Sequence, residues 1–423
     1  MPIPKKDLDE LLHANVISPE TAGAIHNYYH DKKATAANPL LAIFGALGGV
    51  LVGLGIILIF AHNWDNFSRQ VKTLLAFTPL VLSQAFAAWC IVKNKTAVFK
   101  ETAAVLIFFA VGASISLVAQ VYNISGDFPR FLLTWALLCT PLMYLLRSNA
   151  AVVLHLIFST WYAAEAGYSF RDTTIPWTYL LFIAALAPVY HRHLKENNQS
   201  HMTVTLNWLL PLSFCITFGA FMDGADEFVY FLYMAFFGLL YVIGYSETLG
   251  EKPNGYRAIG QLGVIVLLFF GSFRFTWGII INSHNHYEFL VIWMALLACS
   301  GFVIFSTKTW RDRNYFKWVP FLFPILYGIG LASESAAATV TNLILLAVGL
   351  YYIRTGITAM EFRTVNFGLT LIAILTACRF FDTDLSFVVR GVMFVGVGLG
   401  FFAANYTVAK RKKETVTTEP YEN

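Results

Sequence analysis

Residues 40–61 read LLAIFGALGGVLVGLGIILIFA, a run that contains no charged side chain. An α-helix rises about 1.5 Å per residue, so about twenty apolar residues are enough to cross the hydrocarbon core of a bilayer. The run therefore predicts a transmembrane helix. Similar runs recur along the rest of the chain, and their repetition decides the fold class.

We count fourteen apolar segments and predict an all-α, polytopic transmembrane helix bundle of about fourteen spanning helices. The segments are 40–61, 73–92, 102–121, 131–146, 149–170, 175–190, 203–221, 228–245, 258–281, 289–306, 318–331, 335–353, 364–380 and 387–408. The weakest are 131–146, 175–190 and 318–331, because they are short and contain proline. Twelve spans, or a re-entrant pair, are the alternatives.

The composition agrees with this fold class. The chain is 57% hydrophobic and 13% charged, whereas soluble domains carry about 25% charged residues. The net charge of +4 gives no reason to expect nucleic acid as a partner. Since the sequence has no GxxxxGK[ST] or GxGxxG motif, we expect neither ATP-driven transport within this chain nor a cofactor.

Basic residues fall mostly on one side of the predicted membrane. The connections after even-numbered segments, together with the two chain ends, hold 22 Lys and Arg, and the odd-numbered connections hold four, namely Arg69, Lys72, Arg130 and Arg171. Basic loops stay in the cytoplasm. The distribution predicts a multi-pass protein with both termini in the cytoplasm. We expect the outer surface to be acidic, with few basic residues.

Three regions follow from this pattern: a cytoplasmic helical head at 1–38, a transmembrane domain at 39–409 and a polar cytoplasmic tail at 410–423. Ser18-Pro19-Glu20 predicts a helix start, because serine caps helices and proline suits the first helical position. A head this small cannot bury a core of its own. We expect it to dock on the membrane domain or on a protein partner.

Ionisable and polar residues gather at the outer ends of the predicted helices. Arg274 lies inside segment 258–281, and a charge in hydrocarbon must pair, face water or reach the interface. Glu165 is a candidate ion-pair partner for Arg274, and one of the outer aspartates is a candidate partner for Arg379. We interpret the cluster as an outward-facing pocket for a substrate head group, or alternatively as structural ion pairs and snorkelling side chains. Its members are His62, Asp65, Asp127, Glu165, Arg274, Arg379 and Asp382.

Several aromatic residues lie near the predicted outer boundaries of the helices, where an interfacial belt explains them without any ligand. They are Trp64, Tyr122, Trp161, Trp177 and Trp277.

Two histidine-containing motifs are candidates for chemical sites. His284 and His286 are two residues apart, but no third ligand has a fixed spacing to them, so we predict no metal site. His62 and Asp65 fit an acid–base pair or, more simply, a solvated helix end. The catalytic residues of any reaction are therefore left open.

Gly45, Gly49 and Gly53 share one face of the first segment, which permits close approach of another helix. Gly396 and Gly400 in the last segment are a suitable mate for internal packing. The alternative is a homodimer formed through Gly45, Gly49 and Gly53.

The chain resembles a bacterial family of predicted membrane proteins, domain of unknown function 2157. The resemblance rests on VISPE at 16–20, on the FGALGGVLVGLGIILIFAHNW stretch, on GASISLVAQVYNISGD followed by WALLCTPLMYLLRS, and on CRFFDTDLSFVVRGVMF near the C-terminus. It implies a bacterial inner membrane location. It implies no activity, substrate or cofactor.

Three functions remain open from the sequence. The first, which we favour, is a secondary transporter or flippase, with Gln84, His155, Asn207 and Asn342 as polar residues near the midplane. The second is a membrane enzyme that acts on a lipid-linked substrate at the periplasmic face. The third is a non-catalytic scaffold or sensor.

Overall fold

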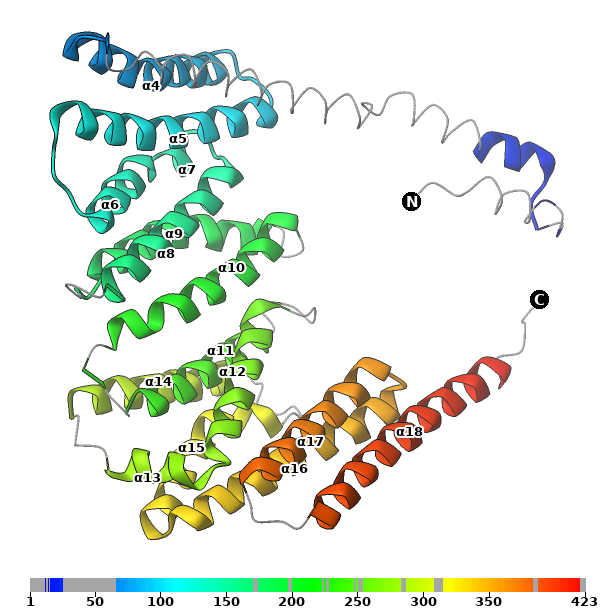
Figure 1. The fold of residues 1–423 in the computed structure, drawn as a ribbon. Helices are drawn as coiled ribbons and strands as arrows, with labels where there is room; N and C mark the ends of the chain where they lie inside the picture. The colour runs from blue at the N-terminus through cyan, green and yellow to red at the C-terminus, as the bar shows by residue number, and fades with distance from the viewer. Residues whose placement is uncertain are drawn as a thin grey trace. The chain divides into compact units, whose positions relative to one another are not determined.

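The computed structural model describes residues 12, 14, 16–25, 66–169, 174–196, 200–222, 224–225, 228–246, 249, 254–282, 287–307, 315–382 and 387–418. All regular secondary structure in these residues is helical (Figure 1). The longer helices are α4 (Arg69–Val92), α5 (Ala97–Tyr122), α6 (Phe128–Cys139), α8 (Asn149–Gly167), α9 (Trp177–Glu196), α10 (His201–Phe218), α11 (Val229–Gly244), α12 (Gly255–Gly271), α13 (Arg274–Asn282), α14 (Tyr287–Ser306), α15 (Val319–Ala332), α16 (Glu334–Ala359), α17 (Phe362–Asp382) and α18 (Phe387–Thr418).

The chain divides into two compact units, Met1–Phe77 and Thr78–Asn423. In the first unit, residues 19–25 form a helix whose start matches the prediction. The Ser18 hydroxyl accepts a hydrogen bond from the backbone N–H of Thr21 at 3.2 Å. Serine thus caps the helix, as the Ser18-Pro19-Glu20 motif predicts.

Each predicted apolar segment from 73–92 onward coincides with one described helix or with two consecutive ones. Seven described helices are long and apolar enough to cross a membrane, or eight if the pair α12–α13 counts as one span. Val229–Gly244 and Phe316–Ala332 are apolar but shorter. The multi-pass, all-helical class is confirmed. The total of fourteen spans stays a prediction, and segment 40–61 lies outside the described residues.

Two of the predicted segments are interrupted. Segment 131–146 divides into α6 and the single turn α7 (Leu142–Leu145), with Thr140 and Pro141 at the junction. The prediction of one helix over 258–281 is wrong, because α12 and α13 meet at 93° around Ser272 and Phe273. Residues 177–190 of segment 175–190, by contrast, lie in one continuous helix, α9, with Pro188 inside it.

Polar side chains fix where several helices begin. The side chains of Asp127, Ser148, Asn254 and Ser333 accept hydrogen bonds from backbone N–H groups in the first turns of α6, α8, α12 and α16. The Glu101 carboxylate, on α5, also accepts from the N–H groups of Asn149 and Ala150, at 2.8 and 2.9 Å. The first backbone N–H groups of a helix have no intrahelical acceptor, and these side chains supply one.

Glycine and tryptophan allow close packing between α5 and α6. A Cβ atom on Gly112 would overlap the Trp135 indole, which lies directly on that backbone. The Trp135 Nε1–H donates to the Phe108 carbonyl at 2.7 Å. Membrane helices usually associate through small residues that let their backbones approach closely. Apolar side chains give little driving force for this association, because lipid tails are as apolar as they are.

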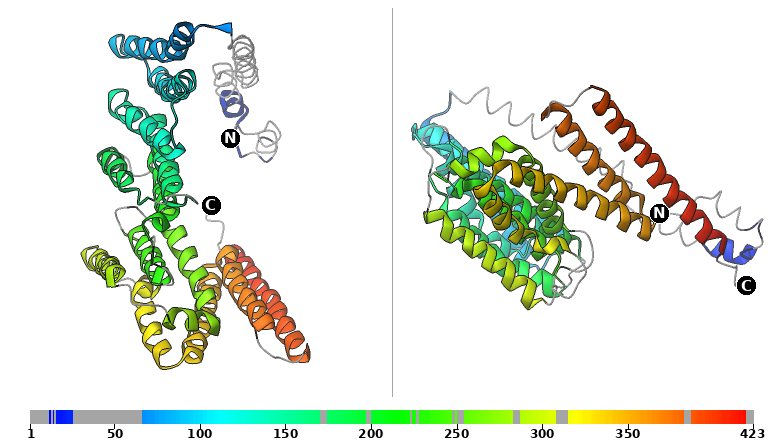
Figure 2. Two further views of the ribbon diagram at one scale, coloured as in Figure 1. Left: turned by 60° about the vertical axis from the view of Figure 1, so that its left-hand side comes forward. Right: turned by 90° about the horizontal axis from the view of Figure 1, so that it is seen from below.

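The C-terminal helices α16, α17 and α18 lie side by side in Figures 1 and 2. Gly349 on α16 and Gly368 on α17 permit this approach, because a Cβ atom on either would meet the other helix at less than 3 Å. On α18, no described atom lies within 4 Å of a Cβ built on Gly396 or Gly400. Their predicted mates in segment 40–61 lie outside the described residues, so packing of these glycines remains a prediction.

Candidate functional site

The backbone bends by 93° at the junction of α12 and α13. Helix α12 ends at Gly271, and α13 starts at Arg274. Between them the N–H groups of Ser272 and Phe273 bond to the carbonyls of Phe269 and Phe270, three residues back. This tightened turn leaves carbonyl groups near the end of α12 without their usual helical partners.

Three side chains from different helices bind the carbonyl groups of this junction. The Trp277 Nε1–H donates to the Gly271 carbonyl at 2.7 Å, and the Asn342 Nδ2–H donates to the Ser272 carbonyl at 2.9 Å. The Tyr230 hydroxyl donates to the Leu267 carbonyl. An interrupted helix is tolerated at membrane depth only when other groups satisfy its backbone. The break is therefore held by specific contacts from α11, α13 and α16.

Packing holds the junction as well. The Trp277 side chain is fully buried, and its ring stacks on Phe323 of α15 with the ring centroids 5.6 Å apart. A Cβ atom on Gly330 would lie only 3.0 Å from the Trp277 ring. The prediction that Trp277 belongs to an interfacial aromatic belt is therefore wrong. It is a core residue that bonds to the broken helix.

Charged side chains from three helices meet at the break. The Arg379 guanidinium, on α17, donates to the Ser272 Oγ at 3.3 Å and lies 4.7 Å from the Phe273 ring centroid. Arg274, at the start of α13, forms an ion pair with Glu334 of α16, with Nε and Oε2 3.5 Å apart. The break therefore combines an interrupted helical backbone with two cations and a carboxylate.

Two buried oxygen atoms at the break are left without a hydrogen-bond partner. They are the Thr276 Oγ1 and the Asn342 Oδ1, and no other buried side-chain oxygen in the described residues is in this state. An unsatisfied buried polar group costs about 1–3 kcal/mol, so such atoms are rare and need an explanation. Because both occur where the helix breaks, this region is the candidate functional site.

The predicted outer cluster is only partly assembled. Arg274 and Arg379 come together at the break, where both flank the Ser272–Phe273 turn. The carboxylate partner of Arg274 is Glu334 rather than Glu165. Glu165, on α8, accepts a hydrogen bond from the Trp161 Nε1–H of its own helix at 3.3 Å.

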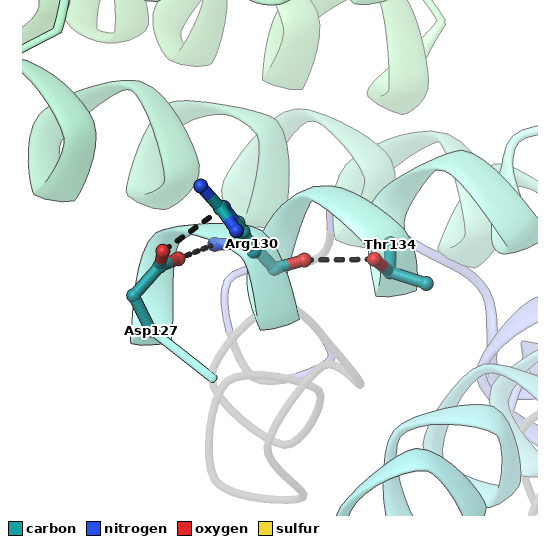
Figure 3. Close-up of polar contacts among 3 residues, drawn as sticks. All are labelled: Asp127, Arg130 and Thr134. Carbon is teal, nitrogen blue, oxygen red and sulfur yellow. Dashed lines mark hydrogen bonds and ion pairs between the residues drawn. The ribbon is translucent and has the colours of Figure 1, made fainter. Parts of the chain in front are cut away.

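Asp127 is satisfied locally. Its carboxylate accepts from the Arg130 backbone N–H at 2.7 Å and pairs with the Arg130 Nε at 3.0 Å, while the Thr134 hydroxyl donates to the Arg130 carbonyl (Figure 3). Asp382 is the last residue of α17, but its side chain is not described. The remaining candidates lie outside the described residues, namely His62, Asp65, His284 and His286.

The polar residues predicted near the midplane mostly bond helices together. His155 is buried and contacts the Phe182 carbonyl at 3.2 Å, and Asn207 accepts from the Tyr190 hydroxyl at 2.6 Å. Gln84 is exposed on α4. Of the four, Asn342 alone takes part in the break.

Ser272, Thr276 and Glu334 are site residues that the sequence pattern does not predict. A signal is present at Gly271-Ser272, two small residues within an apolar run. Small residues in membrane helices serve packing far more often than they mark breaks, so the pair alone could not identify the site.

These features define a multi-pass α-helical membrane protein with an interrupted apolar helix. Residues 9–152 match a family model described as "Predicted membrane protein (DUF2157)". The resemblance to this family is confirmed over those residues, which include most of the head and the first four predicted segments. Comparison with curated proteins and with solved structures gives no significant match.

Proposed function

We propose that this protein is a secondary transporter whose solute site lies at the α12–α13 break. The observation that carries the proposal is the interrupted helix itself, bent by 93° and contacted by polar side chains from α16 and α17. Several transporter folds have their solute and ion sites at discontinuous helices, because the broken ends present backbone dipoles to the solute.

The contacts at the break support binding in addition to packing. Most buried polar side-chain atoms have a hydrogen-bond partner, yet Thr276 Oγ1 and Asn342 Oδ1 both lack one. A polar solute or water in this region would satisfy them. The proposal includes a bacterial inner membrane location with both chain ends in the cytoplasm, which the family resemblance and the distribution of basic residues support.

Transport requires that water reach the site from each side of the membrane in turn. The test is a Thr276→Cys variant in a chain whose five native cysteines are replaced by serine. A membrane-impermeant methanethiosulfonate is added to sealed right-side-out vesicles and, separately, to inverted vesicles. Ile279→Cys is the matched control, because Ile279 is on the same helix and is 52% exposed on its outer surface.

We expect the Thr276→Cys variant to react in both vesicle orientations and the Ile279→Cys variant to react much more slowly. Reaction from one side only would contradict transport and favour an enzyme or sensor with a one-sided site. Failure of Thr276→Cys to react from either side would remove the aqueous site altogether and leave the break as a structural element.

A further inference from the structure

We infer that the α12–α13 break binds a protonated oxyanion of the phosphate type, through the Thr276 hydroxyl, the amide groups at the start of α13 and the guanidinium of Arg379. The inference rests on the proposed function, because it names the class of solute for the same site.

Thr276 supplies the first observation. It is the third residue of α13, its exposed fraction is only 8%, and its hydroxyl has no partner. The Cα–Cβ bond of a helical residue tilts toward the helix N-terminus, so the Thr276 side chain leaves α13 toward the break. The first backbone N–H groups of a helix have no intrahelical acceptor, and together with the helix dipole they favour an anion.

The cations at the break favour the same kind of ligand. Arg274 is paired with Glu334 at 3.5 Å. The Arg379 guanidinium reaches the turn from α17, where it donates to the neutral Ser272 hydroxyl and lies over the Phe273 ring. A guanidinium presents five N–H groups in a planar arrangement that suits phosphate oxygens. Arg379 thus brings a guanidinium to the turn, in contact with Ser272 and Phe273.

Asn342 adds a requirement for a donor on the ligand. Its Nδ2 donates to two carbonyl oxygens, those of Ser272 at 2.9 Å and Ala338 at 2.7 Å, so the amide cannot be turned around. Its Oδ1 is therefore a fixed acceptor that can take an N–H or O–H group. Inorganic phosphate retains at least one O–H at neutral pH, whereas sulfate and carboxylates do not.

The test measures thermal unfolding of the full-length protein in detergent during titration with inorganic phosphate, with sodium sulfate at matched ionic strength as the comparison. A ligand that binds only the folded state raises the unfolding midpoint once its concentration exceeds Kd. We expect phosphate to raise the midpoint and sulfate to raise it far less.

The variant Thr276→Val removes the hydroxyl at nearly constant volume and should weaken phosphate binding by about tenfold to a hundredfold. Thr276→Ser, which keeps the hydroxyl, should retain binding. The control is Thr339→Val on α16, whose exposed hydroxyl donates to the Ser335 carbonyl of its own helix, and it should bind phosphate as the wild type does. Equal responses to phosphate and sulfate, or an unchanged affinity in Thr276→Val, would overturn the inference.

A second arm identifies the source of the phosphate group. The protein is placed in phosphatidylcholine vesicles with or without phosphatidic acid, a phosphomonoester lipid. Stabilisation by phosphatidic acid and not by free phosphate, lost in Thr276→Val, assigns the site to a lipid head group. Stabilisation by free phosphate both in detergent and in vesicles assigns it to a soluble solute.

The two proposals can fail separately. If Thr276→Cys reacts from both sides but phosphate has no effect, the transport proposal is kept and the inference of an oxyanion ligand is rejected. Phosphate binding with access from one side only would keep the oxyanion and discard transport.

Discussion

The Trp277 indole bonds the carbonyl of Gly271, six residues earlier and on the other side of a 93° bend, at a distance of 2.7 Å. Through this hydrogen bond, a side chain of α13 satisfies a carbonyl group at the end of α12. It makes the bend a defined conformation rather than a loose hinge, because opening it would leave a carbonyl unsatisfied in an apolar region.

Replacing Trp277 by Phe keeps an aromatic ring against Phe323 and removes only the N–H donor. We expect a loss of about 1–3 kcal/mol in the free energy of unfolding, because the Gly271 carbonyl is left without a partner. Unfolding by a denaturing detergent, followed by circular dichroism, measures the change. Trp161→Phe is the control, since the Trp161 side chain is exposed and its indole donates to Glu165 of the same helix; a loss as large in the control would argue against a special role for Trp277.

A methyl group at Gly112 should separate α5 from α6. The added Cβ would overlap the Trp135 indole and displace its hydrogen bond to Phe108. We expect Gly112→Ala to destabilise the protein by about 1–3 kcal/mol, as overpacked cores do, even though alanine favours the helix. Gly391→Ala on α18, where no described atom lies within 4 Å of the added Cβ, should be neutral or slightly stabilising. Equal effects of the two substitutions in the same unfolding assay would show that the Trp135 ring moves aside without lowering the free energy of unfolding.

Glu101 should stabilise the start of α8 from a neighbouring helix. Its carboxylate accepts from two backbone N–H groups and from the Ser148 hydroxyl. We expect Glu101→Gln to cost about 0.5–2 kcal/mol, the range for loss of a helix cap. Glu361→Gln is a matched control, because its carboxylate accepts from the exposed Thr364 hydroxyl three residues along the same segment. Hydrogen exchange at residues 149–152 should rise in the Glu101 variant alone, and unchanged protection there would contradict the capping role.

The orientation in the membrane is testable without knowledge of the function. In the chain that lacks native cysteines, Ser125→Cys, between α5 and α6, should react with an impermeant maleimide added to intact cells. Asn94→Cys, between α4 and α5, should react only after the membrane is opened. The reverse result would invert the predicted topology, and reaction at both positions in intact cells would mean that α5 does not span the membrane.

Which segments become helices follows from local sequence alone. Hydropathy is a local property, and every predicted apolar segment from 73–92 onward is helical in the structure. The start of the helix at residue 19 was equally predictable, because the capping group and the capped amide are three residues apart. Local signals also identified Arg274 and Arg379 as residues that had to find partners within the fold.

The position of those partners depends on how the helices pack together. Glu334 is sixty positions from Arg274 along the chain, and Arg379 reaches Ser272 across more than one hundred residues. The turn at Ser272 became a candidate site because α16 and α17 bring Asn342 and Arg379 to it. No pattern within one segment identifies these contacts. Each polar side chain needs a hydrogen-bond or ion-pair partner, but its local sequence does not say which residue the folded chain supplies.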